Sequence, residues 1–325
     1  MGTMKAAVMY APGGPEVLKV ESRPIPTPQP GQVLIRVKAF GVNRSELFTR
    51  QGYSPDVSFP RILGIEAVGV IEDAPGGEFQ KGDTVATVMG GMGRQFDGGY
   101  AEYTCVPAKQ VQAVHSQLPW ETLGAIPEML QTAWGSVFKS LALKKEERLL
   151  VRGGTTSVGL AAAAIAKKFG AQVASTTRNP DREALLRKSG ADQVFIDSGT
   201  IADDVRKVYP TGVDKVLELI GTTSLKDSLR CARQGGIVCM TGMVGNKWSF
   251  DDFAPMEVIP TAVCLTIYDG GLEDFMRTPL DDLIQQIASG ELPVQVGKVF
   301  HLDQIVEAHR TMEENKAGGK IVVLT

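Results

Sequence analysis

A strand, a glycine-containing turn and a helix follow one another between residues 148 and 170. The segment RLLVRGG reads as an apolar strand, and SVGLAAAAIAKKFG carries apolar residues at helical spacing before Gly170, where a left-handed helix end is expected. The turn matches the pattern G-x-G-x-x-G except at its middle position. Such a turn directs backbone N–H groups and the positive end of a helix dipole toward a phosphate. It predicts a dinucleotide-binding turn made of Gly154, Thr155, Thr156, Ser157, Val158 and Gly159.

The positions in this turn have separate tasks. The first glycine makes the turn, the second lets the backbone approach the phosphates, and the third lets the helix pack on the strand. Gly154 and Gly159 fit the first and third tasks, while Thr156 replaces the second glycine. The hydroxyl of Thr156 could itself donate to a phosphate. An ordinary strand-to-helix loop remains the alternative for the turn taken alone.

Strands and helices alternate after this turn. Strands are predicted at 172–178, 193–197, 215–221, 235–242 and 261–269. A helix is predicted at 179–190, where Asn179 can cap, Pro180 fits the first helical position and Gly190 ends the helix. The alternation predicts crossover connections around a buried parallel sheet, that is, an α/β doubly wound Rossmann fold.

The first third of the chain is different, because short β-branched runs at 5–11, 33–43, 67–74 and 83–89 are separated by Pro and Gly clusters. This pattern predicts a compact all-β unit. Beyond residue 269 we expect helices at 280–290 and 304–315 and strands at 296–300 and 319–325. A chain of 325 residues exceeds the size at which single cores stop growing, so two domains are expected.

The second strand of the Rossmann segment bears on the choice of nicotinamide cofactor. An NAD-preferring site places Asp or Glu roughly 20 residues after the glycine turn, to bind the ribose 2′-hydroxyl. Here the strand ends in Ser175, Thr176, Thr177 and Arg178. Arg178 and Arg182 could pair with a 2′-phosphate, with Ser175 and Thr177 as neutral donors, so the sequence favours NADPH over NADH. Solvated surface charge remains the alternative for the two arginines.

Composition excludes several classes of protein. The chain is 43% hydrophobic and 22% charged, and its net charge of -3 with no basic stripe makes nucleic acid an unexpected partner. The longest apolar run, 158–166, is shorter than the roughly 20 residues that cross a bilayer, and no secretory leader is recognisable. The cysteines are too scattered for a disulfide framework or a structural metal, and a reducing cytoplasm is expected; they are Cys105, Cys231, Cys239 and Cys264.

Six ordered segments are more specific than the glycine turn alone. They are VKAFGVNRSELFTRQGYSP, FPRILGIEAVGVI, GGYAEYTCVPA, AIPEMLQTAWGSV, VRGGTTSVGLAAAAIAKKFGA and AHRTMEENKAGGKIVVL. Together they resemble the medium-chain dehydrogenase/reductase superfamily, specifically its zinc-free quinone oxidoreductase branch, which includes zeta-crystallin-like proteins. The resemblance implies a GroES-like β-rich domain over 1–127 and 269–325, a Rossmann domain over 128–268, an active site in the cleft, and commonly a homodimer.

The resemblance also concerns metal binding. Zinc-dependent alcohol dehydrogenases of this superfamily hold a catalytic metal on Cys, His and a third Cys or Asp, and the corresponding places here are Asn43, Ile65 and Glu128. Isoleucine cannot ligate a metal, and the lobe for a second zinc is reduced to GGMGRQFDGGYAEY, so no metal is predicted. Glu66 is expected to be a buried structural carboxylate with an arginine partner. Satisfied or surface positions are expected for the histidines His115, His301 and His309.

Further site residues follow from the resemblance. In similar proteins the asparagine of the GVN turn lies beside the nicotinamide, so Asn43 is a candidate for orienting the ring or the substrate carbonyl. Tyr53 is a second catalytic candidate, through its phenol, although Phe48 replaces one tyrosine that is common in the family and Tyr53 is one place before the other. Thr132 resembles a threonine near the nicotinamide ribose or amide. The backbone near that amide is expected from Gly242, Met243 and Val244.

These features predict an NADPH-dependent oxidoreductase. Without zinc to stabilise an alkoxide, alcohol oxidation is disfavoured. Hydride can instead pass to a quinone or to the β-carbon of an α,β-unsaturated carbonyl, where hydrogen-bond donors meet the charge that develops on oxygen. A non-catalytic NADPH-binding, sensing or structural protein on the same fold remains the alternative, and a metal-dependent alcohol dehydrogenase would require stoichiometric zinc.

Overall fold

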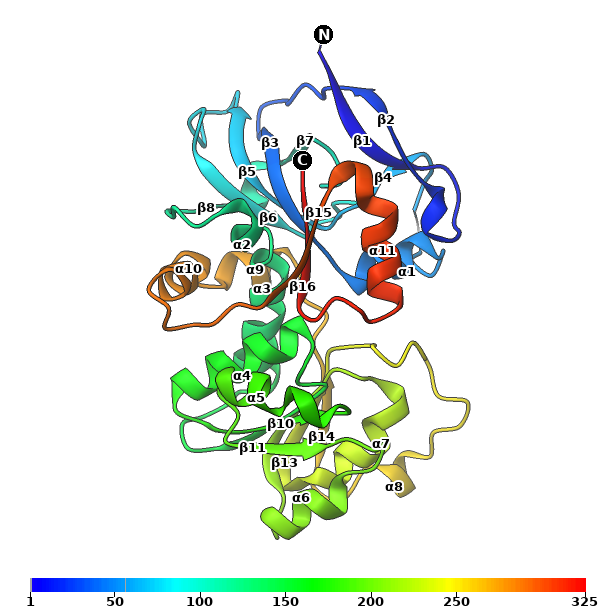
Figure 1. Ribbon diagram of the computed structural model, residues 1–325, viewed down its shortest axis with the longest axis vertical. Coiled ribbons are helices and arrows are strands. Elements are labelled where there is room, and N and C mark those ends of the chain that lie inside the picture. Colours follow the sequence, from blue (N-terminus) through cyan, green and yellow to red (C-terminus); the bar gives the residue numbers. More distant parts are fainter. Residues whose placement is uncertain (1, 56) are drawn as a thin grey trace. The chain divides into compact units, whose positions relative to one another are not determined.

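The computed structural model describes residues 2–55 and 57–325, and the structural statements below concern those residues. The chain divides into two compact units (Figure 1). Unit 1 comprises Met1–Gln131 and Gly270–Thr325, and unit 2 comprises Thr132–Asp269. Unit 1 is rich in antiparallel strands, whereas unit 2 alternates strands and helices around a parallel sheet. The predicted α/β class is therefore confirmed.

The sheet of unit 2 contains, within the described chain, six strands in the order β11-β10-β9-β12-β13-β14. All neighbouring strands are parallel. This order corresponds to the dinucleotide-binding arrangement, and it brings the carboxyl ends of the strands to the one edge where such sheets bind ligands. The strands are β9 (Arg148–Arg152), β10 (Gln172–Thr177), β11 (Gln193–Ile196), β12 (Val213–Glu218), β13 (Ala232–Met240) and β14 (Cys264–Ile267).

Helices cover this sheet: α4 packs against β9 and β10, and α7 packs against β12 and β13. Gly170 ends α4 with a φ of 103°, as predicted. The segment after Asn179 begins as a short 3-10 turn before it becomes α5, and the Asn179 side chain accepts from the Asp181 N–H at 2.9 Å. The helical segments are α3 (Pro127–Gly135, which crosses the boundary between the units), the π-helix η3 (Ser136–Ser140), α4 (Ser157–Phe169), η4 (Pro180–Arg182), α5 (Glu183–Lys188), α6 (Ala202–Val208), α7 (Thr222–Cys231) and α8 (Pro255–Val258).

The helices α6 and α7 are among the helical segments of unit 2 that were not predicted. The buried face of α7 combines Leu225 and Leu229 with the polar side chains Ser224, Asp227 and Ser228, so its apolar repeat is weak in the sequence. The seven-residue α6 is too short for a clear repeat. Of the buried polar side chains of α7, Asp227 and Ser228 contact Arg152 of β9, in a network that is described below.

Unit 1 contains two sheets in its described part. One has β2-β1-β4, and the other has β15-β16-β3-β5-β6-β8 with β7 also pairing with β3. The C-terminal strand β16 lies between β15 and β3, so both ends of the chain contribute to one sheet (Figure 1). The strands are β1 (Thr3–Met9), β2 (Leu18–Pro24), β3 (Gln32–Val42), β4 (Arg61–Ile62), β5 (Glu66–Asp73), β6 (Thr84–Val88), β7 (Tyr103–Pro107), β8 (Val111–Ala113), β15 (Val296–His301) and β16 (Lys320–Leu324).

Unit 1 is not purely β, and the expectation of an all-β first third was wrong at α1, which starts directly after β3. With seven residues, this helix is too short to show an apolar repeat. Among the helices of the described residues, none is both long enough and apolar enough to cross a bilayer. The helical segments are η1 (Pro15–Val17), α1 (Arg44–Arg50), η2 (Ala108–Gln110), α2 (Trp120–Leu123), α9 (Leu272–Arg277), α10 (Leu280–Ala288), η5 (Leu302–Gln304) and α11 (Ile305–Glu313).

Candidate active site

The turn between β9 and α4 is shaped by Gly153 as well as by the predicted glycines. Gly153 has the left-handed φ of 85° that makes the turn. At Gly154 a Cβ atom would lie 2.9 Å from the Cβ of Ser175 and 3.0 Å from the carbonyl oxygen of Thr176. Gly154 therefore allows β10 to approach the turn. This corrects the prediction that Gly154 makes the turn itself.

Thr156 is the N-cap of α4. Its hydroxyl accepts from the Gly159 N–H at 3.0 Å and donates to the carbonyl oxygen of Gly153 at 2.8 Å. Because its one hydrogen is used within the turn, the expectation that Thr156 donates to a phosphate was wrong. A Cβ at Gly159 would lie 2.7 Å from the Gly153 oxygen, so this glycine allows the close packing of helix on turn that its predicted role requires.

Three backbone N–H groups remain available at the start of α4. Those of Thr155, Ser157 and Val158 have no acceptor among residues 2–55 and 57–325, and all three residues are half-buried. The first N–H groups of a helix have no partner within it, and together with the dipole of a 13-residue helix they suit an anion. This donor set fits the pyrophosphate of a dinucleotide.

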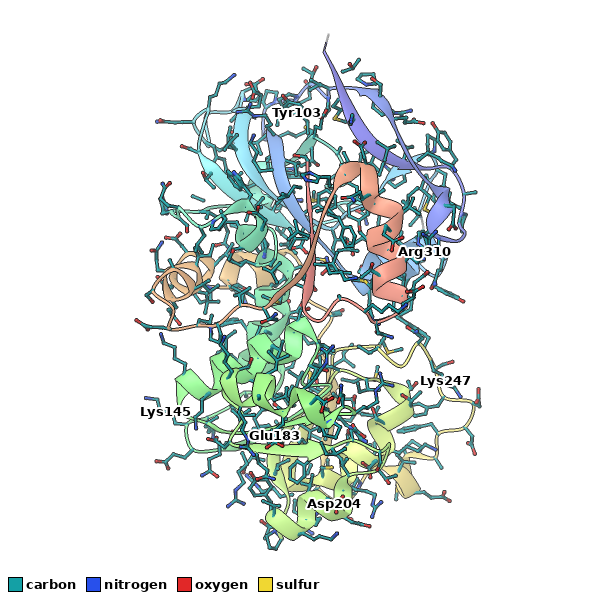
Figure 2. The ribbon with its side chains drawn as sticks, viewed as in Figure 1. Tyr103, Lys145, Glu183, Asp204, Lys247 and Arg310 are labelled. Atoms are coloured by element: carbon teal, nitrogen blue, oxygen red, sulfur yellow. The ribbon has the colours of Figure 1, made fainter. Side chains whose placement is uncertain are left out.

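Two arginines stand at the end of β10 and just beyond it. Arg178 is exposed and Arg182 is half-buried, and neither guanidinium has an acidic partner in the described part of the chain. Arg182 immediately precedes α5, whose first residue, Glu183, is labelled in Figure 2. Unpaired guanidinium groups next to the glycine turn fit a 2′-phosphate.

The two neutral donors predicted beside these arginines are not available. Ser175 is completely buried, and its hydroxyl has no partner among the described residues. The Thr177 hydroxyl donates to the Asn179 carbonyl at 3.0 Å and accepts from the Asn179 N–H at 3.1 Å. The hydrogen of the Thr177 hydroxyl is thus used within the local turn, whereas the Ser175 hydroxyl is enclosed by the sheet without being occupied.

A buried ionic network lies directly beneath the turn, and the sequence analysis missed it. Arg152, the last residue of β9, is fully buried and donates to both carboxylate oxygens of Asp197, at 2.9 and 3.0 Å, and to Asp227 at 2.8 Å. Burial acts to raise the pKa of Asp197, but the hydrogen bonds and charge of Arg152 outweigh it and hold that pKa below its ordinary value. The sequence feature that could have indicated this network is an arginine, Arg152, at the end of an otherwise apolar strand. The network ties the turn to the end of β11 and to α7.

The loop after β13 contains the three predicted residues near the nicotinamide. A Cβ at Gly242 would lie 2.3 Å from the Leu219 oxygen, so this glycine lets the loops after β12 and β13 meet. The N–H groups of Gly242 and Val244 donate to the carbonyls of Glu218 and Leu219, at 3.1 and 3.2 Å. Within the described chain, only the Met243 N–H of the three has no acceptor and is left for a ligand.

Asn43, between β3 and α1, belongs to a buried polar cluster in unit 1. Its amide hydrogens point at Glu66, at 2.9 Å, and at Glu46, at 3.3 Å, while Lys320 donates to its oxygen. The reverse amide orientation would set the oxygen against two carboxylates, so charge fixes the orientation. Asn43 therefore has no N–H left for a substrate carbonyl. It keeps one lone pair on Oδ1.

The ammonium of Lys320 lies among Asn43, Glu66 and Glu128. Lys320 Nζ lies 3.0 Å from Glu66 and 3.7 Å from Glu128. Burial acts to lower the pKa of Lys320, but these carboxylates outweigh it and hold that pKa above its ordinary value. The partner of the buried Glu66 is thus a lysine, which corrects the expected arginine. In the described chain, no three His, Cys, Asp or Glu side chains are disposed to hold a metal ion.

Tyr53 and Thr132 are the remaining predicted residues, and Glu46 is a buried carboxyl group that the sequence analysis did not single out. Tyr53 is 73% exposed, and its ring packs edge-on against Phe48 with 6.3 Å between ring centroids. Thr132, on α3, is half-buried. Glu46 is fully buried, one of its carboxylate oxygens has no partner among the described residues, and burial raises its pKa to about 7.

The histidines are satisfied or exposed, as predicted. His309 is buried, accepts from Arg50 Nε at 3.2 Å and lies 3.0 Å from the Tyr100 hydroxyl. Since Arg50 donates to Nδ1, the ring proton is on Nε2. Burial, and then the charge of Arg50, lower the pKa of His309 to about 3. His115 and His301 are exposed.

The chain is similar to known oxidoreductases over nearly its whole length. An alcohol dehydrogenase GroES-like domain matches residues 29–116, and a zinc-binding dehydrogenase domain matches residues 189–323. The chain is 30% identical to a quinone oxidoreductase of Pongo abelii, over 99% of this chain and 98% of that one. It is 27% identical to a 2-haloacrylate reductase of Burkholderia sp., over 98% of both chains. A mycobacterial protein solved with NADPH matches with a TM-score of 0.88 at 26% identity, covering 99% of this chain and all of the other.

Proposed function

The chain belongs to the quinone oxidoreductases of the medium-chain dehydrogenase/reductase superfamily, and from this premise we propose that it reduces quinones or α,β-unsaturated carbonyls with NADPH, without a metal. One observation carries the choice of cofactor. Arg178 and Arg182 lack acidic partners in the described chain, and they lie close in sequence to the strand end where an NAD-preferring protein would carry an acid. That charge arrangement supports a 2′-phosphate.

The residues that would hold the cofactor come mainly from unit 2. The free N–H groups at the start of α4 would bind the pyrophosphate, and Arg178 and Arg182 would bind the 2′-phosphate. Within unit 2 the Met243 N–H is assigned to the nicotinamide end, and the places of Asn43 and Thr132 beside the nicotinamide stay predictions from the resemblance. NADPH, when bound, supplies a hydride from C4 of its nicotinamide ring.

The proposed reaction requires little acid–base catalysis by the side chains of the protein. As hydride adds to the β-carbon of an enone, the C=C electron pair moves toward the carbonyl and the oxygen becomes negative. A proton from solvent then completes the saturated product at the α-carbon. For a quinone, the same two electrons and one further proton give the hydroquinone. The task of the protein is to place hydrogen-bond donors at that oxygen. Tyr53 is one candidate donor, because its phenol is exposed.

A metal-independent reaction is supported by the chemistry of the side chains. Ile65 offers no ligand atom, and the ammonium of Lys320 bonds the oxygen of Asn43 and lies 3.7 Å from Glu128. A divalent cation would have to displace a buried, paired ammonium there. We further propose a homodimer, as the resemblance implies. Analytical ultracentrifugation tests that.

The experiment is a scan of electron acceptors. Purified protein is mixed with NADPH and a panel of quinones and enones, and loss of the reduced-nicotinamide absorbance is followed, with NADH in parallel. We expect turnover with NADPH and weaker turnover with NADH. Flat traces across the panel, with NADPH binding intact by fluorescence, would instead favour a nucleotide-binding protein without turnover.

A further inference from the structure

The proposed reaction needs hydrogen-bond donors at the acceptor oxygen, and the side chain of Asn43 cannot supply them. The charge on the acceptor oxygen needs hydrogen bonds, yet both amide hydrogens of Asn43 point at Glu46 and Glu66. Tyr53 is 73% exposed, so the protein does not enclose its phenol. A donor that is held in place, and whose hydrogens are free, would stabilise the charge on the acceptor oxygen better.

Ser45 and Arg94 meet this requirement. Arg94 Nη2 donates to Ser45 Oγ, and Ser45 lies two residues from Asn43, on the first turn of α1. Arg94 Nε is buried and has no acceptor among the described residues. The Ser45 hydroxyl hydrogen likewise has no acceptor there, since the Thr49 hydroxyl takes the backbone oxygen of Ser45 and not its side chain. Both side chains are half-buried, so a ligand can reach their exposed parts, although not the buried Nε of Arg94.

The loop that carries Arg94 is held in place by backbone packing. Gly93 has a φ of 75°, and a Cβ there would lie 2.8 Å from the carbonyl oxygen of Gly64. A Cβ at Gly98 would lie 2.2 Å from the same oxygen. The Arg94 N–H also donates to the Gly91 carbonyl at 3.1 Å. The arginine is therefore presented from a tightly packed turn, which limits the reorganisation needed during reaction.

No carboxylate neutralises this guanidinium. In the described chain the one side-chain partner of Arg94 is the Ser45 hydroxyl, whereas Arg61, which bonds the same loop, is paired with Asp97 at 2.9 Å. Arg61 and Arg94 both have a buried Nε without an acceptor in the described chain, so the missing carboxylate is what distinguishes Arg94. A half-buried cation without an anion is a costly arrangement unless a ligand supplies the charge. Donation from Arg94 to Ser45 Oγ also polarises the serine O–H, which makes it a stronger donor.

We propose that Ser45 and Arg94 together form the oxyanion-binding pair for the acceptor, so that the enolate or phenolate oxygen is met by the Ser45 hydroxyl and the guanidinium of Arg94. This inference rests on the proposed reductase function. Both residues act as donors throughout, and no bond to either is made or broken. The pair therefore stabilises the transition state, in which negative charge develops on the acceptor oxygen, more than it stabilises the neutral acceptor.

The kinetic test uses Ser45→Ala, Arg94→Met and the double variant. The control is Arg61→Met, which removes an arginine of β4 that pairs with Asp97 on the loop of Arg94. Removing one oxyanion donor lowers kcat by roughly a hundredfold or more. We expect such losses in kcat at little changed KM for either single variant, with the double variant close to the worse single one, because the two residues act as one unit. Arg61→Met should stay within about threefold of wild type in kcat. Single variants that keep wild-type kcat would overturn the proposal.

A binding test does not depend on turnover. 4-Nitrophenol, whose phenolate absorbs at longer wavelength than the phenol, is titrated with pH in the presence of protein and NADP⁺. We expect wild type to shift ionisation of the bound probe by about tenfold or more toward the phenolate, and Arg94→Met to abolish this shift. An unshifted probe, or equal behaviour of the two proteins, would contradict the proposal.

The two tests distinguish a failure of the proposed oxyanion-binding pair from a failure of the proposed reductase function. If wild type reduces quinones or enones and the Arg94 variant does so equally well, the oxyanion assignment fails and the reductase function stands. If wild type turns over nothing but shifts the nitrophenol ionisation, the anion site stands and the reductase function fails. NADPH affinity, measured by fluorescence, should be unchanged in every variant, which checks that unit 2 remains folded.

Discussion

Removal of the two arginines beyond the glycine turn is the sharpest test of cofactor choice. In the double variant Arg178→Ala/Arg182→Ala, NADPH binding should weaken much more than NADH binding. Neither guanidinium has an acidic partner in the described chain, so their loss leaves no internal charge unpaired and should hardly change the free energy of unfolding. Any effect on affinity then reports contact with the cofactor.

The magnitude follows from the exposure of the two groups. A hydrogen bond to a charged group contributes roughly 1.5–3 kcal/mol, and we use the lower end because Arg178 is exposed and screened by salt. Two such contacts amount to about 3 kcal/mol, which corresponds to roughly a hundredfold increase in Kd for NADPH. NADH lacks the 2′-phosphate, and its Kd should change by less than about threefold.

The assay is fluorescence titration of the protein with NADPH and with NADH at two salt concentrations. Arg187→Ala is the matched control, because Arg187 is an exposed arginine in the same segment that pairs with Glu183. The wild-type preference for NADPH should shrink at the higher salt concentration, and that of the double variant should not. Equal weakening of both cofactors, or an effect of Arg187→Ala as large as that of the double variant, would refute the placement of the 2′-phosphate.

Two further predictions concern stability. Thr156→Ala removes the N-cap of α4 and should lower the free energy of unfolding by about 1 kcal/mol, whereas Thr156→Ser should keep it; chemical denaturation measures both, and equal stabilities would show that the cap is not formed. His309 is buried with a pKa of about 3, below its ordinary 6.5, so the unfolded chain binds the additional proton between these values. The contribution of the neutral His309 to the free energy of unfolding is complete above about pH 6.5. Between pH 6.5 and 3 it is lost on acidification at roughly 1.4 kcal/mol per pH unit. The difference in free energy of unfolding between wild type and His309→Gln should therefore fall over this pH range. A difference that is constant with pH would contradict the buried neutral histidine.

The sequence predicted the parallel sheet and the glycine turn well, because both depend on local patterns. The alternation of strands and helices and the caps at Gly170 and Asn179 depend only on residues that are close together in the sequence. Which glycine makes the turn could not be read in this way, because Gly153 and Gly154 differ in φ and in their approach to β10, and both depend on tertiary packing.

The roles of polar side chains were the least predictable part. Thr156 and Thr177 looked like free donors, but each is occupied by the local backbone, and Ser175 is buried by its own sheet. The orientation of Asn43 depends on Lys320, which lies 277 residues away in the chain. Ser45 and Arg94 are 49 residues apart, and their contact could not be inferred without the packing of a loop against α1.

Direct transfer of hydride in the absence of metal is the central claim, and isotope transfer measures it. Protein treated with a chelator and shown by elemental analysis to be free of zinc is incubated with methyl vinyl ketone and with NADPH that carries deuterium at both C4 positions of the nicotinamide. The product is analysed by mass spectrometry and NMR. We expect deuterium at the β-carbon of the product, at the same rate as untreated protein gives with the same deuterated cofactor. Product without deuterium, or activity lost with the metal and restored by zinc, would contradict it.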